Sequence, residues 1–185
     1  MPIARHLEQR VPERQDAITS SARQTEALGA RLALTLVGAA PAPRLSAAVV
    51  VLLKGELGAG KTTFVRGFVR ELAGGSDIVV QSPTFALARR YHTTPPVQHL
   101  DLYRFYGQPD AAAAVRDLGL DHDEYDAHED NGDNNDDAND DANDHANDLG
   151  ITFVEWPLPG TWPKAVCVEL VILSARRRRV RIELP

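Results

Sequence analysis

Residues 47–72 constrain the fold of this chain more than any other stretch. They open with a β-branched apolar run, residues 48–53, which suits a buried strand and is too short to span a membrane. A glycine-rich loop, GELGAGKT, follows, and from Phe64 to Leu72 an apolar residue recurs at every fourth position, as on one face of a helix. Gly74 and Gly75 then end the helical pattern. The predicted order is strand, loop, helix.

The loop fits G-x-x-x-x-G-K-[ST], the pattern of phosphate-binding loops in nucleotide-binding proteins. Its glycines let backbone N–H groups turn inward, and the helix N-terminus adds a partial positive charge. Lys61 is predicted to reach the β- and γ-phosphates, and the Thr62 hydroxyl to bind Mg²⁺. A glycine-rich turn that binds nothing is the alternative. The residues predicted to contact the nucleotide here are Gly55, Glu56, Leu57, Gly58, Ala59, Gly60, Lys61, Thr62 and Thr63.

The length and apolar content fit one domain, because 185 residues with 43% hydrophobic side chains can form one ordinary core. Residues 1–20 show no periodicity and are predicted to be a mobile leader, followed by an α/β domain over residues 21–185. The leader lacks the apolar segment of a signal peptide, and no apolar run approaches 18 residues. We therefore expect a cytoplasmic protein without membrane contact.

The net charge of −6 comes from one acidic insert, residues 121–148, which holds 11 Asp, 2 Glu and neither Lys nor Arg. Without the insert, 20 basic residues face 13 acidic ones, which favours an anionic partner. The insert repeats DDAN, DDAN, DHAN and has almost nothing to bury, so we predict disorder. An EF-hand fails because Ala127 stands at the first ligand position. Binding of a metal or a partner is the remaining alternative.

Weaker patterns predict the remaining elements. Ser21 and Gln24 have the spacing of a capping box before a helix that ends near Val37. The further predicted elements are strands at 77–81, 84–91, 97–104 and 151–154, a helix at 110–118, and a closing hairpin of strands 166–173 and 180–184 around the arginine turn 176–179.

A phosphate loop also needs an acid at the end of a nearby strand, to support Mg²⁺ or to orient the attacking water. Two residues qualify, Asp101 and Glu155, although either could be an ordinary charge at a strand end. Thr84 stands where a switch residue could sense the γ-phosphate. Trp156 either packs in the core or lies against the nucleotide or a partner.

Four motifs stand in one order, GELGAGKT, SPTF, HLDLYR and VEWP. In this order they resemble the TsaE (YjeE) family, the bacterial P-loop ATPases of tRNA threonylcarbamoyladenosine biosynthesis. The similarity runs from about Thr25 to Leu184, and the ordered set is more specific than any single motif.

The resemblance implies a P-loop NTPase-like three-layer fold with a mixed parallel and antiparallel sheet. It also implies an ATPase that works with the TsaD and TsaB proteins and is linked to tRNA indirectly, through that complex. Because a site this small leaves the phosphates partly open, we expect the ATPase to be weak without its partners. By the resemblance, Lys61 and Thr62 bind phosphate and Mg²⁺, Glu155 supports the metal and Asp101 is needed for hydrolysis. By the resemblance, Thr84 also belongs to a switch-like segment, and Thr25 and the arginine turn lie near the base. Thr84 and Trp156 are counted with the loop residues as predicted nucleotide contacts.

The chain departs from the family pattern at Glu56, where Asp is usual, at Ala86, where Thr is frequent, and at the acidic insert. Two other functions stay open at this point. A small-molecule kinase would place an acceptor hydroxyl where the water would be. A non-enzymatic module would use ATP binding only to clamp a partner or RNA.

Overall fold

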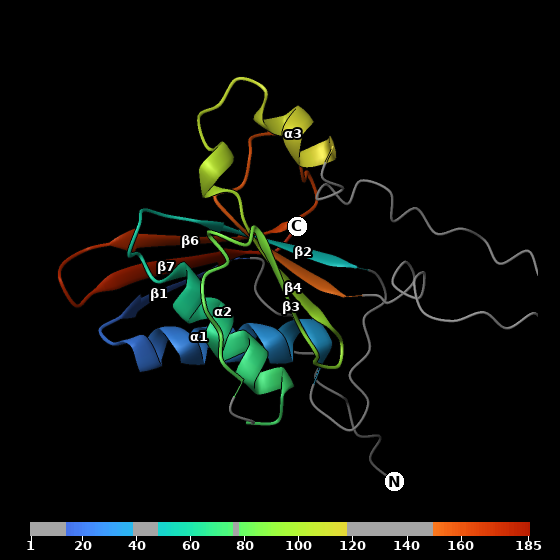
Figure 1. The fold of residues 1–185 in the computed structure, drawn as a ribbon. Coiled ribbons are helices and arrows are strands. Elements are labelled where there is room, and N and C mark those ends of the chain that lie inside the picture. The colour runs from blue at the N-terminus through green and yellow to red at the C-terminus, as the bar shows by residue number, and fades with distance from the viewer. Residues whose placement is uncertain (1–13, 39–47, 76–77, 118–149) are drawn as a thin grey trace, which may run out of the picture.

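The computed structural model describes residues 14–38, 48–75, 78–117 and 150–185 (Figure 1). Its helices and strands, in chain order, are β1 (Arg14–Thr19), α1 (Ala22–Val37), β2 (Val49–Lys54), α2 (Lys61–Leu72), β3 (Ala88–Tyr91), β4 (Val97–Asp101), the 3₁₀-helix η1 (Tyr103–Phe105), α3 (Ala111–Asp117), β5 (Ile151–Glu155), β6 (Val166–Ile172) and β7 (Arg178–Glu183).

The strands form one mixed sheet with the order β1-β7-β6-β2-β5-β4-β3. The four central strands, β6, β2, β5 and β4, run parallel to one another. Antiparallel strands extend the sheet at both sides, β7 and β1 beyond β6 and β3 beyond β4. Helices α1 and α2 cover one face, and α3 and η1 lie on the other (Figure 1). This confirms the predicted three-layer α/β fold with a mixed sheet.

Two apolar clusters hold the layers together. The larger cluster joins α1 and α2 to one face of the sheet, where the rings of Phe68 and Phe153 meet edge to face with centroids 4.8 Å apart. The smaller cluster, which includes Val115, Val154 and Trp162, lies under α3 on the opposite face. The helical face predicted from Phe64 to Leu72 therefore packs against the sheet as expected.

Helices α1 and α2 approach each other unusually closely, because each has a glycine at the contact. A Cβ atom added at Gly67 would lie 1.9 Å from the carbonyl oxygen of Glu26, and one at Gly29 would lie 2.1 Å from that of Phe64. Only glycine lets the two backbones lie this close. Since α2 begins at the phosphate loop, this contact also fixes α1 relative to the loop.

The prediction of a mobile leader is wrong for residues 14–19, which form the edge strand β1. Strand β1 pairs with β7 along its whole length, and the Asp16 carboxylate accepts a hydrogen bond from Arg181 at 3.1 Å. The segment has few apolar residues, so its strand character comes from pairing with distant residues and leaves little local pattern. Residues 1–13 lie outside the described residues.

Other boundaries also differ from the predictions. Residues 78–81 form no strand, and Val80 turns its carbonyl oxygen toward Arg66 of α2 instead of toward a neighbouring strand. The predicted strand over 84–91 is confined to β3, and the one over 97–104 ends at Asp101, where η1 follows. Ser21 caps α1 as predicted, although Gln24 accepts from the backbone of Ser20. The acidic insert, 121–148, lies outside the described residues.

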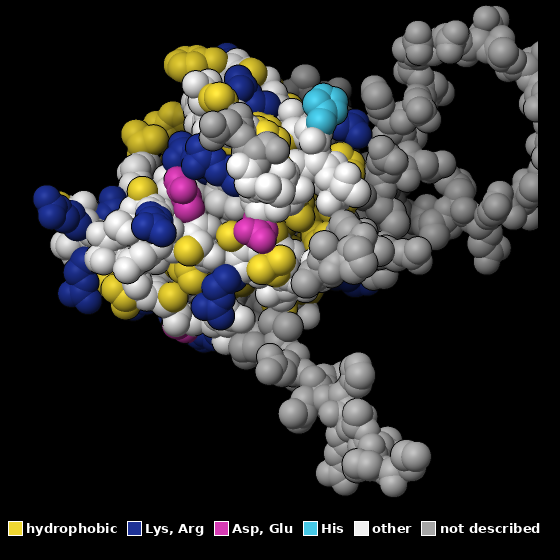
Figure 2. All heavy atoms as spheres, turned by 90° about the horizontal axis from the view of Figure 1, so that it is seen from below, with side chains coloured by type: hydrophobic (Ala, Val, Ile, Leu, Met, Phe, Trp, Pro, Cys, Tyr) yellow, Lys and Arg dark blue, Asp and Glu magenta, His cyan; other side chains and the backbone are white. Residues whose placement is uncertain are grey.

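No helix in the described ranges combines the length and the apolar character that crossing a bilayer requires. On the face seen from below, basic side chains outnumber acidic ones (Figure 2), as the charge balance outside the insert predicts.

Substituting Gly67 tests the close contact between the helices. Gly67→Ala is expected to lower the free energy of unfolding by about 1 to 3 kcal/mol, because the new methyl group overpacks the contact with the Glu26 backbone. Glu71→Ala, at an exposed position of the same helix, is the control and should stay within about 0.5 kcal/mol of the unmodified chain. Urea unfolding measures both. A Gly67→Ala chain as stable as the control would show that the helices can separate without cost.

Candidate functional site

The loop between β2 and α2 takes the form that its sequence predicts. Gly55, Gly58 and Gly60 have φ angles of 145°, 78° and 104°, which side chains other than glycine rarely adopt. At Gly55 an added Cβ would also lie 2.4 Å from the carbonyl oxygen of Leu170, so the loop must start close against β6. Gly60 then directly precedes α2, which leaves the N-terminus of that helix facing the loop.

Lys61 is almost completely buried at the start of α2. Its ammonium group donates to the carbonyl oxygens of Gly55 at 2.9 Å and Glu56 at 3.1 Å. It also lies 4.1 Å from the centroid of the Trp156 ring, within range of a cation–π interaction. Burial lowers the pKa of the Lys61 ammonium below its ordinary value, and the carboxylates of Glu155 and Asp101 oppose that shift.

The sheet register places the two predicted acids side by side. Asp101 at the end of β4 and Glu155 at the end of β5 are direct cross-strand partners, and β5 lies next to β2, which leads into the loop. Only 2% of Asp101 and 3% of Glu155 is exposed. Parallel strands end at the same edge of a sheet, so both acids reach the edge where the phosphate loop begins.

Glu155 is bound to the phosphate loop helix and to β4 through one oxygen. Its Oε1 lies 2.7 Å from the Thr62 hydroxyl, which donates to it, and 3.0 Å from Nε2 of His99. A hydroxyl that donates its proton keeps lone pairs that can bind a cation. Thr62 and Glu155 therefore have the donor chemistry of the metal site predicted for them.

Asp101 is held by a different set of donors. Its Oδ2 accepts from the hydroxyls of Thr84 at 2.6 Å and Ser82 at 2.8 Å, and its Oδ1 accepts from the backbone N–H of Tyr103 at 3.0 Å. The segment around Thr84 is therefore tied to the acid at the strand end. The next residue, Phe85, is 94% exposed.

Trp156 lies at the site and not in the core. It has a φ of 58°, in the left-handed region that few residues other than glycine adopt. Its ring centroid lies 5.1 Å from that of Tyr103 and 5.2 Å from that of Tyr106. These two rings and the Lys61 ammonium fix the indole at the carboxyl end of β5.

A cavity of about 460 Å³ opens on the other side of the loop. Its wall includes Thr25 of α1, Thr63 of α2, the loop residues 58–60, Arg176 and Arg178. Arg178 is the first residue of β7, so the predicted arginine turn over 176–179 ends at Arg177. Arg178 also donates to the carbonyl oxygen of Gly58 at 3.3 Å. Thr25, Arg176 and Arg178 therefore line a cavity beside the phosphate loop.

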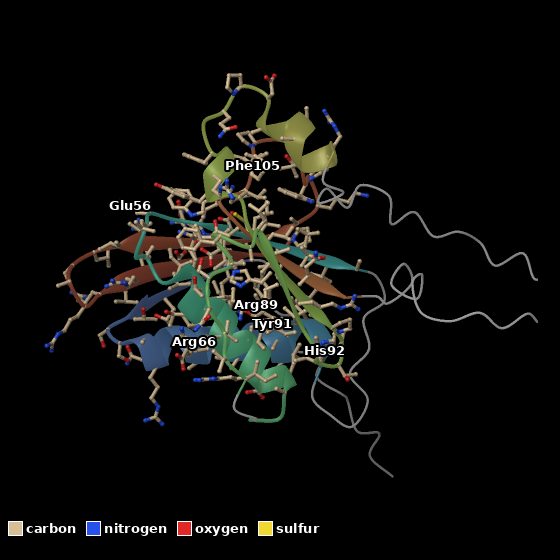
Figure 3. The ribbon with its side chains drawn as sticks, viewed as in Figure 1. Glu56, Arg66, Arg89, Tyr91, His92 and Phe105 are labelled. Atoms are coloured by element: carbon tan, nitrogen blue, oxygen red, sulfur yellow. The ribbon has the colours of Figure 1, made fainter. Side chains whose placement is uncertain are left out.

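The remaining loop residues differ in exposure. Ala59 is fully buried, Leu57 is 77% exposed at the loop tip, and the side chain of Glu56 is solvent-exposed on the loop (Figure 3).

In the described part of the chain, no three His, Cys, Asp or Glu side chains gather closely enough to hold a metal by themselves. Mg²⁺ in nucleotide sites usually takes only one or two protein carboxylates together with phosphates and waters, so a site at Thr62 and Glu155 would not need such a cluster.

The sequence alone did not indicate two side chains of this site, those of His99 and Ser82, or one backbone group, the N–H of Tyr103. His99 had a usable signal, since it stands two residues before Asp101 and side chains two apart on a strand share a face. The contacts of Ser82 and Tyr103 depend on the turn geometry at either side of β3 and β4, for which the sequence gives no comparable signal.

Comparisons with known proteins identify the family of the chain. The family model described as threonylcarbamoyl adenosine biosynthesis protein TsaE matches residues 19–180. The tRNA threonylcarbamoyladenosine biosynthesis protein TsaE of Aquifex aeolicus (strain VF5) is 32% identical over 139 residues, which cover 75% of this chain and 79% of that protein. The protein of the same name from Bacillus subtilis (strain 168) is 42% identical over 73 residues, which cover 39% of this chain and only 41% of that protein.

The crystal structure of Bacillus subtilis YdiB shares the fold, with a TM-score of 0.55 and 22% sequence identity over 92% of this chain and 85% of that one. The family model spans most of the chain, and its matched region contains the phosphate loop, both acids and the arginine turn. The chain therefore belongs to the TsaE family.

Proposed function

We propose that this chain binds ATP with Mg²⁺ at the phosphate loop and hydrolyses it, as the ATPase component of the bacterial machinery that makes threonylcarbamoyladenosine in tRNA. The observation that carries the proposal is the 2.7 Å hydrogen bond from Thr62 to Glu155. It joins the helix of the phosphate loop to a buried carboxylate at the end of a parallel strand. A glycine-rich turn without a ligand has no need of such a pair.

Each polar group of the site has a proposed role. Lys61 and the loop N–H groups bind the β- and γ-phosphates, and Thr62 and Glu155 hold Mg²⁺, which when bound neutralises charge on the phosphates. Asp101 orients the attacking water. Thr84 donates to Asp101, so its segment is placed to respond to the γ-phosphate.

The cavity beside the loop is proposed to take the nucleoside. It lies between α1 and the arginine turn, and its wall includes Thr25, Thr63 and Arg178. Its volume of about 460 Å³ is within the range usual for small-molecule sites. Arg178 reaches both this cavity and the carbonyl oxygen of Gly58, so it can contact the nucleotide without leaving the loop.

We further propose that TsaD and TsaB are the partners, that tRNA is reached through their complex, and that the work takes place in the cytoplasm. The relatives' names support the pathway, since they read tRNA threonylcarbamoyladenosine biosynthesis protein. A partner surface is supported by exposed apolar side chains around the phosphate side of the site. These side chains are Leu57, Phe85, Tyr103 and Tyr106. P-loop proteins are often completed in trans, so the isolated chain should turn over slowly.

The first test of the function measures ATP hydrolysis by the chain alone and with TsaD and TsaB. The chain alone is expected to hydrolyse ATP slowly, and the partners are expected to raise this rate. Lys61→Ala and Glu155→Ala should each reduce the rate of hydrolysis by at least about 100-fold, because positioning and charge stabilisation supply nearly all catalysis of phosphoryl transfer. Glu71→Gln, which changes an exposed acid near the other end of α2, is the control and should keep the rate.

Two outcomes would contradict this function. If the rate of ADP formation does not change with the partners but requires an added small hydroxyl compound, the chain is a kinase. Tight ATP binding without turnover, even with TsaD and TsaB present, would make it a clamp.

A second test addresses the proposed nucleoside cavity. Arg178→Ala should weaken ATP binding about fivefold to tenfold, equivalent to about 1 to 1.4 kcal/mol, because it removes a cation from the cavity wall. Arg179→Ala is the matched control, since neighbouring residues on a strand point to opposite faces. Titration with a fluorescent ATP analogue measures both. Equal affinities of the two variants would place the nucleoside elsewhere.

A third test concerns the acidic insert, which we propose is not needed for nucleotide binding. The chain returns from it to the sheet at the amino end of β5, where Ile151 donates to the carbonyl oxygen of Pro96, whereas the phosphate loop lies at the carboxyl ends of the strands. Replacing residues 121–148 by a short Gly/Ser linker should therefore leave ATP affinity within about threefold. A larger loss would show that the insert acts on the nucleotide site.

A further inference from the structure

His99 lies completely buried in β4, two residues before Asp101. It stands opposite Phe153 in the register with β5, and its ring reaches along the same face of the sheet to Glu155. The distance from Nε2 to Glu155 Oε1 is 3.0 Å. Neither the fold nor the proposed nucleotide contacts account for this pair.

The direction of this hydrogen bond follows from the chemistry of its two groups. An ionised carboxylate has only lone pairs to offer, so the ring must donate through an N–H at Nε2. The other ring nitrogen, Nδ1, is buried and has no hydrogen-bond partner within the described ranges. Glu155 is therefore the polar partner of this histidine in the described part of the chain.

The position is otherwise apolar. Val97 precedes His99 on the same face of β4, Phe153 lies across from it, and the ring of Tyr91 on β3 (labelled in Figure 3) lies with its centroid 6.5 Å from the imidazole. Burying an imidazole with one unpaired nitrogen costs free energy that a leucine or phenylalanine would not cost. The bond to Glu155 is what a histidine contributes here and an apolar residue cannot.

The two donors to Glu155 differ in what else they must do. Thr62 belongs to the phosphate loop, and in the proposed function its hydroxyl also faces the metal. His99 belongs to the sheet and not to the loop, so its hold on Oε1 comes from an element that does not bind the nucleotide in the proposed function. A glutamate side chain has three rotatable bonds, so its carboxylate can take many positions. A hydrogen-bond donor that is fixed in the sheet restricts the carboxylate to one of them.

We propose that His99 is a positioning residue for the metal site, whose N–H to Oε1 fixes the orientation of the Glu155 carboxylate that would hold the cation. The inference rests on the proposed function, because it assigns Glu155 to Mg²⁺. It adds a residue of β4 that acts on the metal through Glu155 and touches neither the nucleotide nor the metal.

The experiment compares His99→Leu, His99→Gln and Val97→Ala with the unmodified chain. Leucine removes the N–H, whereas the side-chain amide of glutamine can replace it. Val97→Ala is the control for lost packing at the same buried face. Three quantities are measured, namely the melting temperature, the affinity for ADP without divalent ions, and the affinity of the ADP complex for Mn²⁺ by electron paramagnetic resonance.

His99→Leu is expected to weaken Mn²⁺ binding by about tenfold or more, the usual effect of removing a group that orients a metal ligand. Its ADP affinity without metal should be unchanged, and its melting temperature should fall no further than that of Val97→Ala. His99→Gln should recover most of the Mn²⁺ affinity, and Val97→Ala should keep it.

Native Mn²⁺ affinity in His99→Leu, or an equal loss of affinity in Val97→Ala, would overturn the positioning role and leave the proposed function standing. An unmodified chain that binds ADP no better with Mn²⁺ or Mg²⁺ than without them would instead overturn the metal role of Glu155, and the inference with it.

Discussion

The site depends on hydrogen bonds and ring contacts that stabilise three charged side chains buried by the fold. Lys61, Asp101 and Glu155 are each at least 96% buried. An isolated charge at such depth would be very costly, so every one of them needs polar partners. Backbone carbonyls and an indole ring surround the lysine, two hydroxyls and an N–H bind Asp101, and a hydroxyl and an imidazole bind Glu155. Both donors to Glu155 and both hydroxyls on Asp101 come from other segments of the chain, so the site can form only together with the sheet.

Local patterns in the sequence predicted the parts of the site that are local in the chain. Strand, loop and helix around Lys61 follow one another directly, and the acids at 101 and 155 end apolar strands, so periodicity and motif spacing were sufficient. Strand β1 was missed because its pairing with β7 leaves no apolar alternation in residues 14–19. The role of His99 was missed because its partner lies 56 residues away, and only the register of β4 with β5 brings the two together.

The close contact of α1 with α2 also shapes the cavity beside the loop. Gly29 and Gly67 bring the helix backbones together, and α1 then begins beside the phosphate loop, where Thr25 forms part of the cavity wall. From the sequence alone, a glycine within a helix indicates only a weaker helix. Its packing role appears once both helices are placed, which is why the sequence offered no reason, apart from the family resemblance, to expect Thr25 near a nucleotide.

The same burial determines how the site can bind a polyphosphate. The ammonium of Lys61 belongs to an almost completely buried side chain and donates to the carbonyl oxygens of Gly55 and Glu56. Phosphate oxygens would exchange with these weaker neutral acceptors, so binding need not desolvate the lysine again, and hydrogen bonds between charged groups are stronger than those they replace. Folding has already met the free-energy cost of desolvating the Lys61 ammonium. The same burial lowers the pKa of Lys61. Preorganised charges of this kind favour phosphate binding because they need little rearrangement when the ligand arrives.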